Sequence, residues 1–116
     1  MTDEAVLDEA TEEPAGLSDE QKRARRRGLA QMSVTLAMQA RWEEALAVNS
    51  EILEMFPDDP EACNRMGNAY MQLNRVAEAI ESYERTLVAQ PTNVIAQRNV
   101  TRLAALKAAT LSSPDS

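Results

Sequence analysis

Residues 60–93 read PEACNRMGNAYMQLNRVAEAIESYERTLVAQPTN, and this segment is an imperfect copy of the thirty-four residues that precede it. A fixed period of about this length is typical of stacked helical repeats, in which one unit alone is too small to bury its apolar face. Such chains usually present a surface to a partner. Six positions are identical in the two copies, namely Met32 and Met66, Arg41 and Arg75, Glu44 and Glu78, Ala45 and Ala79, Leu53 and Leu87, and Pro57 and Pro91.

The spacing of apolar residues and the chain breaks predict five helices and no strand. Ser18, followed three residues later by Gln21, fits a capping box at the start of the first helix. Asp59 and Asn93 are suitable N-caps, and Asn74 tolerates the left-handed backbone that often ends a helix. The predicted helices cover residues 19–39, 42–56, 60–73, 76–90 and 94 to about 109.

Several large side chains are expected to pack inside the helical array rather than to bind anything. Met32 and Met66 occupy equivalent positions of the two copies, and both are predicted in the core. The lone Cys63 is interpreted as a small core side chain rather than a reactive thiol. Tyr70 and Tyr83 are interpreted as packing residues. On the last helix, the side predicted to carry the apolar residues contains Val100, Leu103 and Leu106.

The net charge of −7 is unevenly distributed along the chain. Residues 1–20 contain eight carboxylates and no base, whereas the remaining residues carry a net charge of +1. We therefore expect a disordered acidic leader over residues 1–17, a folded domain over residues 18–109, and a disordered tail over residues 110–116. No membrane-length apolar run and no signal-peptide pattern occur in the sequence, so a cytoplasmic protein is expected.

The segment 60–93 resembles a repeat of the tetratricopeptide family, a helix–turn–helix unit of this length. Met66-Gly67, Tyr70, Ala79, Tyr83 and Pro91 match the family pattern. The resemblance implies an all-α fold of two stacked hairpins, about 26–59 and 60–93, plus a capping helix, in a short right-handed superhelix. It also implies a protein-binding scaffold whose concave surface is lined by the first helix of each unit.

The earlier copy departs from this family pattern at three positions. Ser33 replaces the glycine, Leu36 the tyrosine and Asn49 the aromatic residue of the second helix. Gly67 and Ala79 of the later copy have a physical reason to be small, because the two helices of a hairpin cross closely there. Asn49 makes the packing of the earlier hairpin harder to predict.

The resemblance predicts a groove that binds a peptide or a partner surface. The guanidinium group of arginine can bind a carboxylate through two parallel hydrogen bonds. An acidic group or free carboxylate of the partner is therefore expected near Arg98 and Arg102. Alternatively, these arginines are ordinary solvated helix positions. The family's carboxylate clamp is absent in its usual register, where Ala30 and Val34 stand. The predicted groove residues are Arg27, Ala30, Val34, Ala37, Met38, Asn64, Arg65, Asn68, Met71, Gln72, Arg98, Asn99 and Arg102.

A basic cluster over residues 22–27 supports a second interpretation, that of a nucleic-acid- or ribosome-associated accessory protein. The carboxylates just before the cluster and the aromatic content of 3% weaken it. In a third interpretation the chain is the interaction part of a larger protein. The cluster residues that would contact an anion or nucleic acid are Lys22, Arg23, Arg25 and Arg26.

The sequence does not predict catalysis. It contains no histidine, a single cysteine, and neither a glycine-rich phosphate loop nor a nucleophile elbow. We therefore expect no catalytic residue, no metal and no cofactor, and a protein partner rather than a membrane. Two units plus a cap predict a monomer of modest stability.

Overall fold

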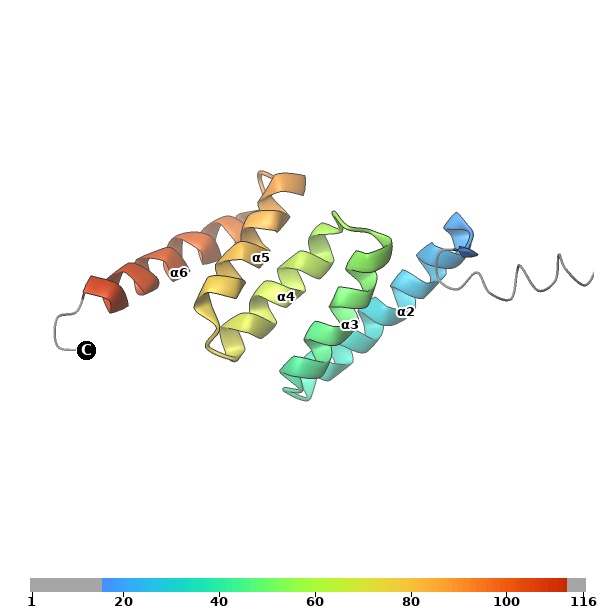
Figure 1. Cartoon of the computed structure of the whole chain (residues 1–116), viewed down its shortest axis with the longest axis horizontal. Helices are drawn as coiled ribbons and strands as arrows, with labels where there is room; N and C mark the ends of the chain where they lie inside the picture. The colour runs from blue at the N-terminus through green and yellow to red at the C-terminus, as the bar shows by residue number, and fades with distance from the viewer. Residues whose placement is uncertain (1–15, 113–116) are drawn as a thin grey trace, which may run out of the picture.

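The computed structural model describes residues 16–112, which contain five α-helices and no strand (Figure 1). The predicted leader lies almost entirely in residues 1–15, outside the described residues, as do residues 113–116 of the predicted tail. The last helix reaches Ser112, beyond its predicted end at about Ala109. The helices are α2 (Asp19–Met38), α3 (Trp42–Met55), α4 (Pro60–Gln72), α5 (Val76–Ala89) and α6 (Val94–Ser112).

The helices lie in chain order along the molecule, and each packs mainly against the helix before it and the helix after it (Figure 1). α2 pairs with α3 as one hairpin, α4 pairs with α5 as the next, and α6 covers α5. This is the architecture of a stacked repeat, in which each unit contacts only its neighbours. The predicted all-α fold of helical hairpins is confirmed.

Three helix starts carry the side-chain caps that the sequence predicts. Ser18 Oγ accepts a hydrogen bond from the Gln21 amide at 3.1 Å, and Gln21 Oε1 accepts one from the Ser18 amide at 2.9 Å. Asp59 caps α4 through the amide of Ala62 at 3.0 Å. Asn93 occupies the equivalent position before α6 and caps the amide of Ala96 at 2.9 Å. These bonds satisfy amides that a helix start leaves without partners.

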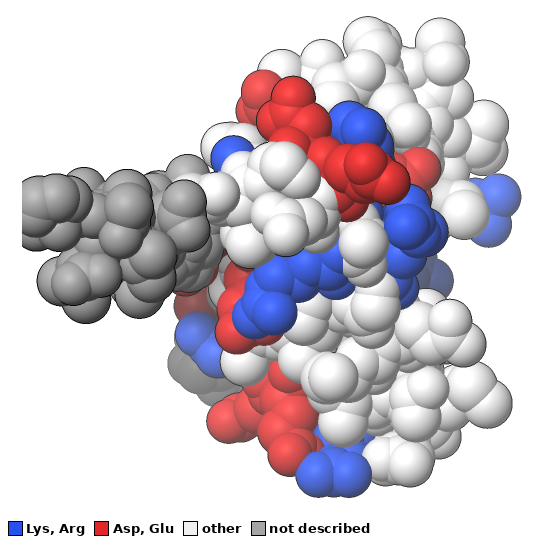
Figure 2. All heavy atoms as spheres, turned by 90° about the vertical axis from the view of Figure 1, so that its right-hand side faces the viewer, with Lys and Arg blue, Asp and Glu red and all other residues white. Residues whose placement is uncertain are grey.

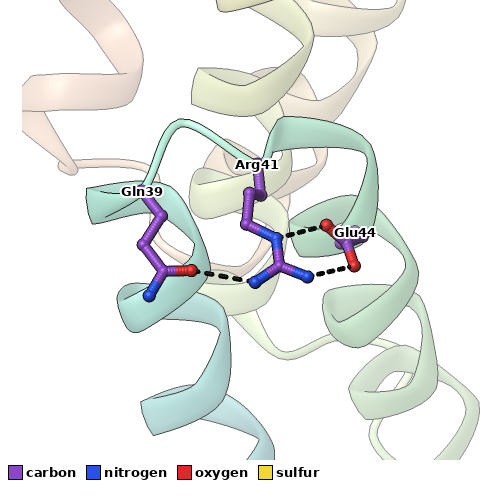
Figure 3. Close-up of polar contacts among 3 residues, drawn as sticks. All are labelled: Gln39, Arg41 and Glu44. Carbon is purple, nitrogen blue, oxygen red and sulfur yellow. Dashed lines mark hydrogen bonds and ion pairs between the residues drawn. The ribbon is translucent and has the colours of Figure 1, made fainter.

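The turns inside the two hairpins have matching backbone and matching ion pairs. Ala40 and its equivalent Asn74 both adopt positive φ angles, 59° and 61°. Arg41 forms an ion pair with Glu44, 2.6 Å between Nε and Oε1, and also donates to Gln39 Oε1 at 3.0 Å (Figure 3). Arg75 and Glu78 form the equivalent pair at 2.7 Å in the second hairpin. The repeat is therefore preserved in the turns as well as in the helices.

One predicted core residue, Met32, is exposed, and a large apolar residue of the last helix, Leu106, is exposed as well. Met66 is buried against Leu46 of α3, but its equivalent Met32 is 49% exposed, because no described helix precedes α2 to cover that face. Leu106 is 53% exposed because the second half of α6 extends beyond α5 (Figure 1). The prediction that Met32 lies in the core is therefore wrong.

Candidate functional site

A pocket of about 270 Å³ opens between α2 and α4, with α3 behind it; we call it the α2–α4 pocket. Apolar side chains from all three helices provide most of its wall. Polar groups enter it from each helix. Its lining consists of Ser33, Val34, Ala37 and Met38 from α2, Trp42, Ala45 and Asn49 from α3, and Arg65, Asn68 and Ala69 from α4.

The pocket brings together the central part of the predicted groove. Val34, Ala37 and Met38 of α2 face Arg65 and Asn68 of α4, as the alternation of lining helices predicts. Sequence reasoning missed the residues behind them, because it assigned the lining to the first helix of each unit alone. The missed residues are Ser33, Trp42, Ala45, Asn49 and Ala69.

Asn49 closes the pocket from α3 and is almost completely buried. Its amide nitrogen donates to the carbonyl oxygen of Ala45 at 2.9 Å, and its Oδ1 accepts from Nε of Arg65 at 2.9 Å. Burial lowers the pKa of the Arg65 guanidinium, which nevertheless stays charged at neutral pH. Asn49 therefore packs within a hydrogen-bonded pair, and it holds an arginine at the pocket.

Ser33 is the one polar lining residue whose buried side-chain oxygen has no hydrogen-bond partner within the described part of the chain. Its exposed fraction is 1%. Nearly all buried polar atoms in proteins find a partner, because an unpaired one costs about 1–3 kcal/mol. An unpaired hydroxyl beside a hollow of this size is therefore a feature that a bound group would explain.

A second, shallower hollow continues from Arg65 towards the start of α4. It contains two more predicted groove residues, Arg27 and Ala30, together with Asp59 and Glu61. Arg65 thus borders both hollows and connects them. Because the two carboxylates lie at this end, the second hollow is mixed in charge rather than purely basic.

The predicted groove residues of α6 lie one repeat further along. Arg102 donates from Nη2 to Asn99 Oδ1 at 3.2 Å and approaches the sulfur of Met71 at 3.5 Å. Met71 is one helical turn from Asn68, so α4 joins this group to the α2–α4 pocket on one face. Arg98 and Arg102 also border a shallow hollow on α6 with Val94.

Besides Met71 and Asn99, two further predicted groove residues line none of these hollows. Gln72 is exposed at the end of α4. Asn64 is half-buried, and its Oδ1 is buried without a hydrogen-bond partner within residues 16–112. Neither Gln72 nor Asn64 therefore lines the pocket or the shallower hollows.

The basic cluster of α2 is divided rather than presented as one charged surface. Arg26 stacks over Phe56, 4.2 Å from guanidinium carbon to ring centre, and pairs with Asp59 at 3.4 Å. Arg25 lies 3.8 Å from Glu51. Figure 2 shows the α2 end of the molecule, where basic side chains are flanked by acidic ones. Lys22 is half-buried, and Arg23 is exposed.

No other group in the described residues suggests chemistry. Cys63 is buried, and burial raises the pKa of its thiol, which disfavours the reactive thiolate. No set of three potential ligands among His, Cys, Asp and Glu could hold a metal ion within residues 16–112. None of the described helices is long and apolar enough to cross a membrane.

Comparison with known protein families identified a match over most of the helical part of the chain. A family model described as tetratricopeptide repeat matches residues 36–110, which include the last turn of α2 and nearly all of α3 to α6. A search of curated proteins found no match to the chain. The matched segment contains the later repeat that carries the family motif, whereas Ser33 and Val34, two of the four α2 residues of the pocket, lie before it.

Proposed function

Because the chain belongs to the tetratricopeptide repeat family, whose repeats generally mediate protein–protein interactions, we propose that it is a non-catalytic interaction module. In this proposal residues 18–109 act as one domain. A peptide or a partner surface binds along the face shared by α2, α4 and α6, which we call the concave groove. The α2–α4 pocket is the principal contact.

The observation that carries this proposal is the pocket itself. It combines apolar walls with four polar side chains, Ser33, Asn49, Arg65 and Asn68, which is the composition typical of ligand-binding pockets. Met38 stands at its rim with 83% of its side chain exposed. A flexible thioether in that position adapts to apolar partners of varied shape.

The α6 end of the groove is proposed to meet an acidic group of the partner. Arg98 and Arg102 are both exposed there, and a guanidinium fork binds a carboxylate through two parallel hydrogen bonds. Asn99 already orients Arg102. The partner segment would then run from an apolar contact at α2 to an ionic contact at α6.

We favour the groove over the basic cluster as the binding surface. The cluster's Arg25 and Arg26 have acidic partners within the chain, so they offer less free charge to a phosphate backbone. Nuclease treatment separates the two interpretations. Partners of the groove should remain bound after nuclease and after neutralisation of residues 22–27, whereas nucleic-acid-dependent partners should be lost.

Site-specific crosslinking tests the proposal. A photo-reactive amino acid replaces Met38 in one variant of the full chain and Val88 in another. Both side chains are apolar and 83% exposed, but Val88 lies on α5, outside the concave groove. In an extract of the producing cell, we expect a distinct crosslinked protein from position 38 and none from position 88. Equal crosslinking from both positions would contradict the proposal.

A further inference from the structure

The two repeats differ in the side chains that occupy one equivalent space between their helices. Each residue that lines the α2–α4 pocket has a counterpart thirty-four residues later, between α4, α5 and α6. In the later repeat, Tyr83 of α5 occupies this space and is 2% exposed. Its counterpart in the earlier repeat is Asn49, which is too short to fill it.

Tyr83 depends on the absence of a side chain at Gly67. A Cβ atom built at Gly67 would lie 2.7 Å from the nearest atoms of the Tyr83 ring, closer than real contacts allow. The counterpart of Gly67 is Ser33, whose side chain stands where the ring would have to pass. The earlier repeat therefore has a serine–asparagine pair where the later repeat has a glycine–tyrosine pair. The two differences are linked, because the side chain of Ser33 leaves no room for a tyrosine ring.

Other counterparts also lose volume in the earlier repeat. Ala37 stands in place of Met71, which packs against the core around Tyr83, and Ala69 in place of the buried Leu103. Trp42 in place of Val76 restores part of that volume. The remaining hollow measures about 270 Å³. A cavity of about 150 Å³ already binds benzene in an engineered protein, so an aromatic ring fits here.

The polar groups around the hollow match a phenol hydroxyl. In the later repeat, burial raises the pKa of the Tyr83 hydroxyl, and the nearby polar side chain of Asn99 opposes that rise. The counterpart of Asn99 is Arg65, whose Nε donates to Asn49 while its two terminal nitrogens form no hydrogen bond within residues 16–112; the charges of Asp59 and Glu61 act on it as well. Ser33 Oγ also lacks a partner. A phenol can accept from Arg65 and donate to Ser33, whereas a benzene ring can do neither.

We propose that the α2–α4 pocket binds a tyrosine side chain supplied by the partner, in the space that Tyr83 fills within the later repeat. The ring packs against Ala37, Ala45 and Ala69, and its hydroxyl pairs with Ser33 and Arg65. Both tyrosines of this chain lie in helices α4 and α5, so the ring comes from another molecule. This inference rests on the proposed function and names the side chain that the groove recognises.

The test uses p-cresol and toluene as probes of the tyrosine and phenylalanine side chains, titrated separately into the full isotope-labelled chain. Backbone amide resonances report binding. We expect p-cresol to shift the resonances of pocket residues on α2, α3 and α4 and to bind several times more tightly than toluene. Toluene binding as tightly as p-cresol, or shifts spread outside the pocket, would overturn the inference.

Three variants sharpen the result. Ser33→Ala should weaken p-cresol binding about two- to tenfold, the worth of one hydrogen bond, and leave toluene binding unchanged. Ser50→Ala, an exposed serine of α3 outside the pocket, is the matched control and should change neither. The double variant Ser33→Gly/Asn49→Tyr copies the later repeat into the earlier one. Circular dichroism checks its fold, and p-cresol binding should disappear because the chain's own ring fills the pocket.

These outcomes are independent of the crosslinking experiment. Binding of p-cresol that persists in the double variant would place the phenol elsewhere and overturn the inference. Crosslinking from position 38 together with equal affinities for p-cresol and toluene would leave the interaction module intact and reject tyrosine as its ligand. Phenol binding at the pocket without any crosslinked partner would instead count against the proposed function.

Discussion

The earlier hairpin, α2 and α3, and the later hairpin, α4 and α5, share their turns and ion pairs but differ in their interiors. The later hairpin is filled by Tyr83 against Gly67, whereas the earlier one keeps a pocket beside Ser33 and Asn49. The comparison indicates that a repeat can lack part of its internal packing and have in its place a pocket in which another molecule could bind.

The largest effect is expected from removing the ring of the later hairpin. Tyr83→Ala should lower the free energy of unfolding by about 3–5 kcal/mol, because it leaves a cavity among Gly67, Ala79 and Leu103. Urea unfolding followed by circular dichroism measures it. A loss below about 1 kcal/mol would show that Tyr83 is not the centre of that core. For comparison, Asn49→Ala should cost less, since it borders an existing pocket.

Alanine substitutions at equivalent positions of the two hairpins should change the free energy of unfolding in opposite directions. Gly67→Ala should cost about 1–3 kcal/mol, because the new Cβ atom meets the Tyr83 ring at 2.7 Å. Ser33→Ala removes a buried hydroxyl without a partner and should leave stability unchanged or raise it by up to about 1 kcal/mol. Urea unfolding of both variants measures the two changes. Destabilisation of similar size at both positions would contradict the contrast.

Substitutions in the turns of the two hairpins should change the free energy of unfolding by a smaller amount. Ala40 and Asn74 share a left-handed backbone that asparagine tolerates better than alanine. Ala40→Asn should therefore raise the free energy of unfolding by roughly 0.5–1 kcal/mol, and Asn74→Ala should lower it by a similar amount. Thermal unfolding detects both. Changes of the same sign would mean that something besides the backbone angle controls these turns.

The smallest effect concerns the ion pairs, and it should be the same in both hairpins. The hydrogen bonds from Arg41 and Arg75 hold the pKa of Glu44 and Glu78 below the ordinary value of 4.5. A carboxylate whose pKa is lower in the folded state stabilises that state above its unfolded pKa, and this contribution is lost as the pH falls through its folded pKa. Both side chains are exposed, so solvent screens the pairs.

Urea midpoints measured from pH 7 down to pH 3 test this expectation. Glu44→Gln and Glu78→Gln should each slightly flatten the decline of the midpoint below about pH 4.5, and to the same extent. A clearly larger effect of one variant would indicate that the two turns are not equivalent.

The sequence predicted the repeat architecture because its signals are local and periodic. The caps at Ser18, Asp59 and Asn93 and the turn at Asn74 each depend on a few neighbouring residues, and the structure confirms them. The exposure of Met32 was missed for the opposite reason. Burial of that position depends on a preceding helix, which the thirty-four-residue period cannot reveal at the first unit.

The site was predicted only in part. Assigning the lining to alternate helices found Val34, Met38, Arg65 and Asn68, but it did not find the wall provided by α3. A signal for that wall was present in the sequence. Ser33 and Asn49 are where the earlier repeat departs from the family pattern, and together they create the hollow. Taken alone, Asn49 indicated only that the packing of the earlier hairpin was harder to predict, because its pairing with Ser33 becomes evident only in three dimensions.

Crosslinking in the double variant Ser33→Gly/Asn49→Tyr tests the central claim most directly. The photo-reactive group stays at position 38, and the pocket beside it is filled by the chain's own ring. We expect a folded protein that no longer yields the crosslinked partner. A folded double variant that crosslinks the partner as efficiently as the parent chain would contradict it, because the partner would then not need the pocket.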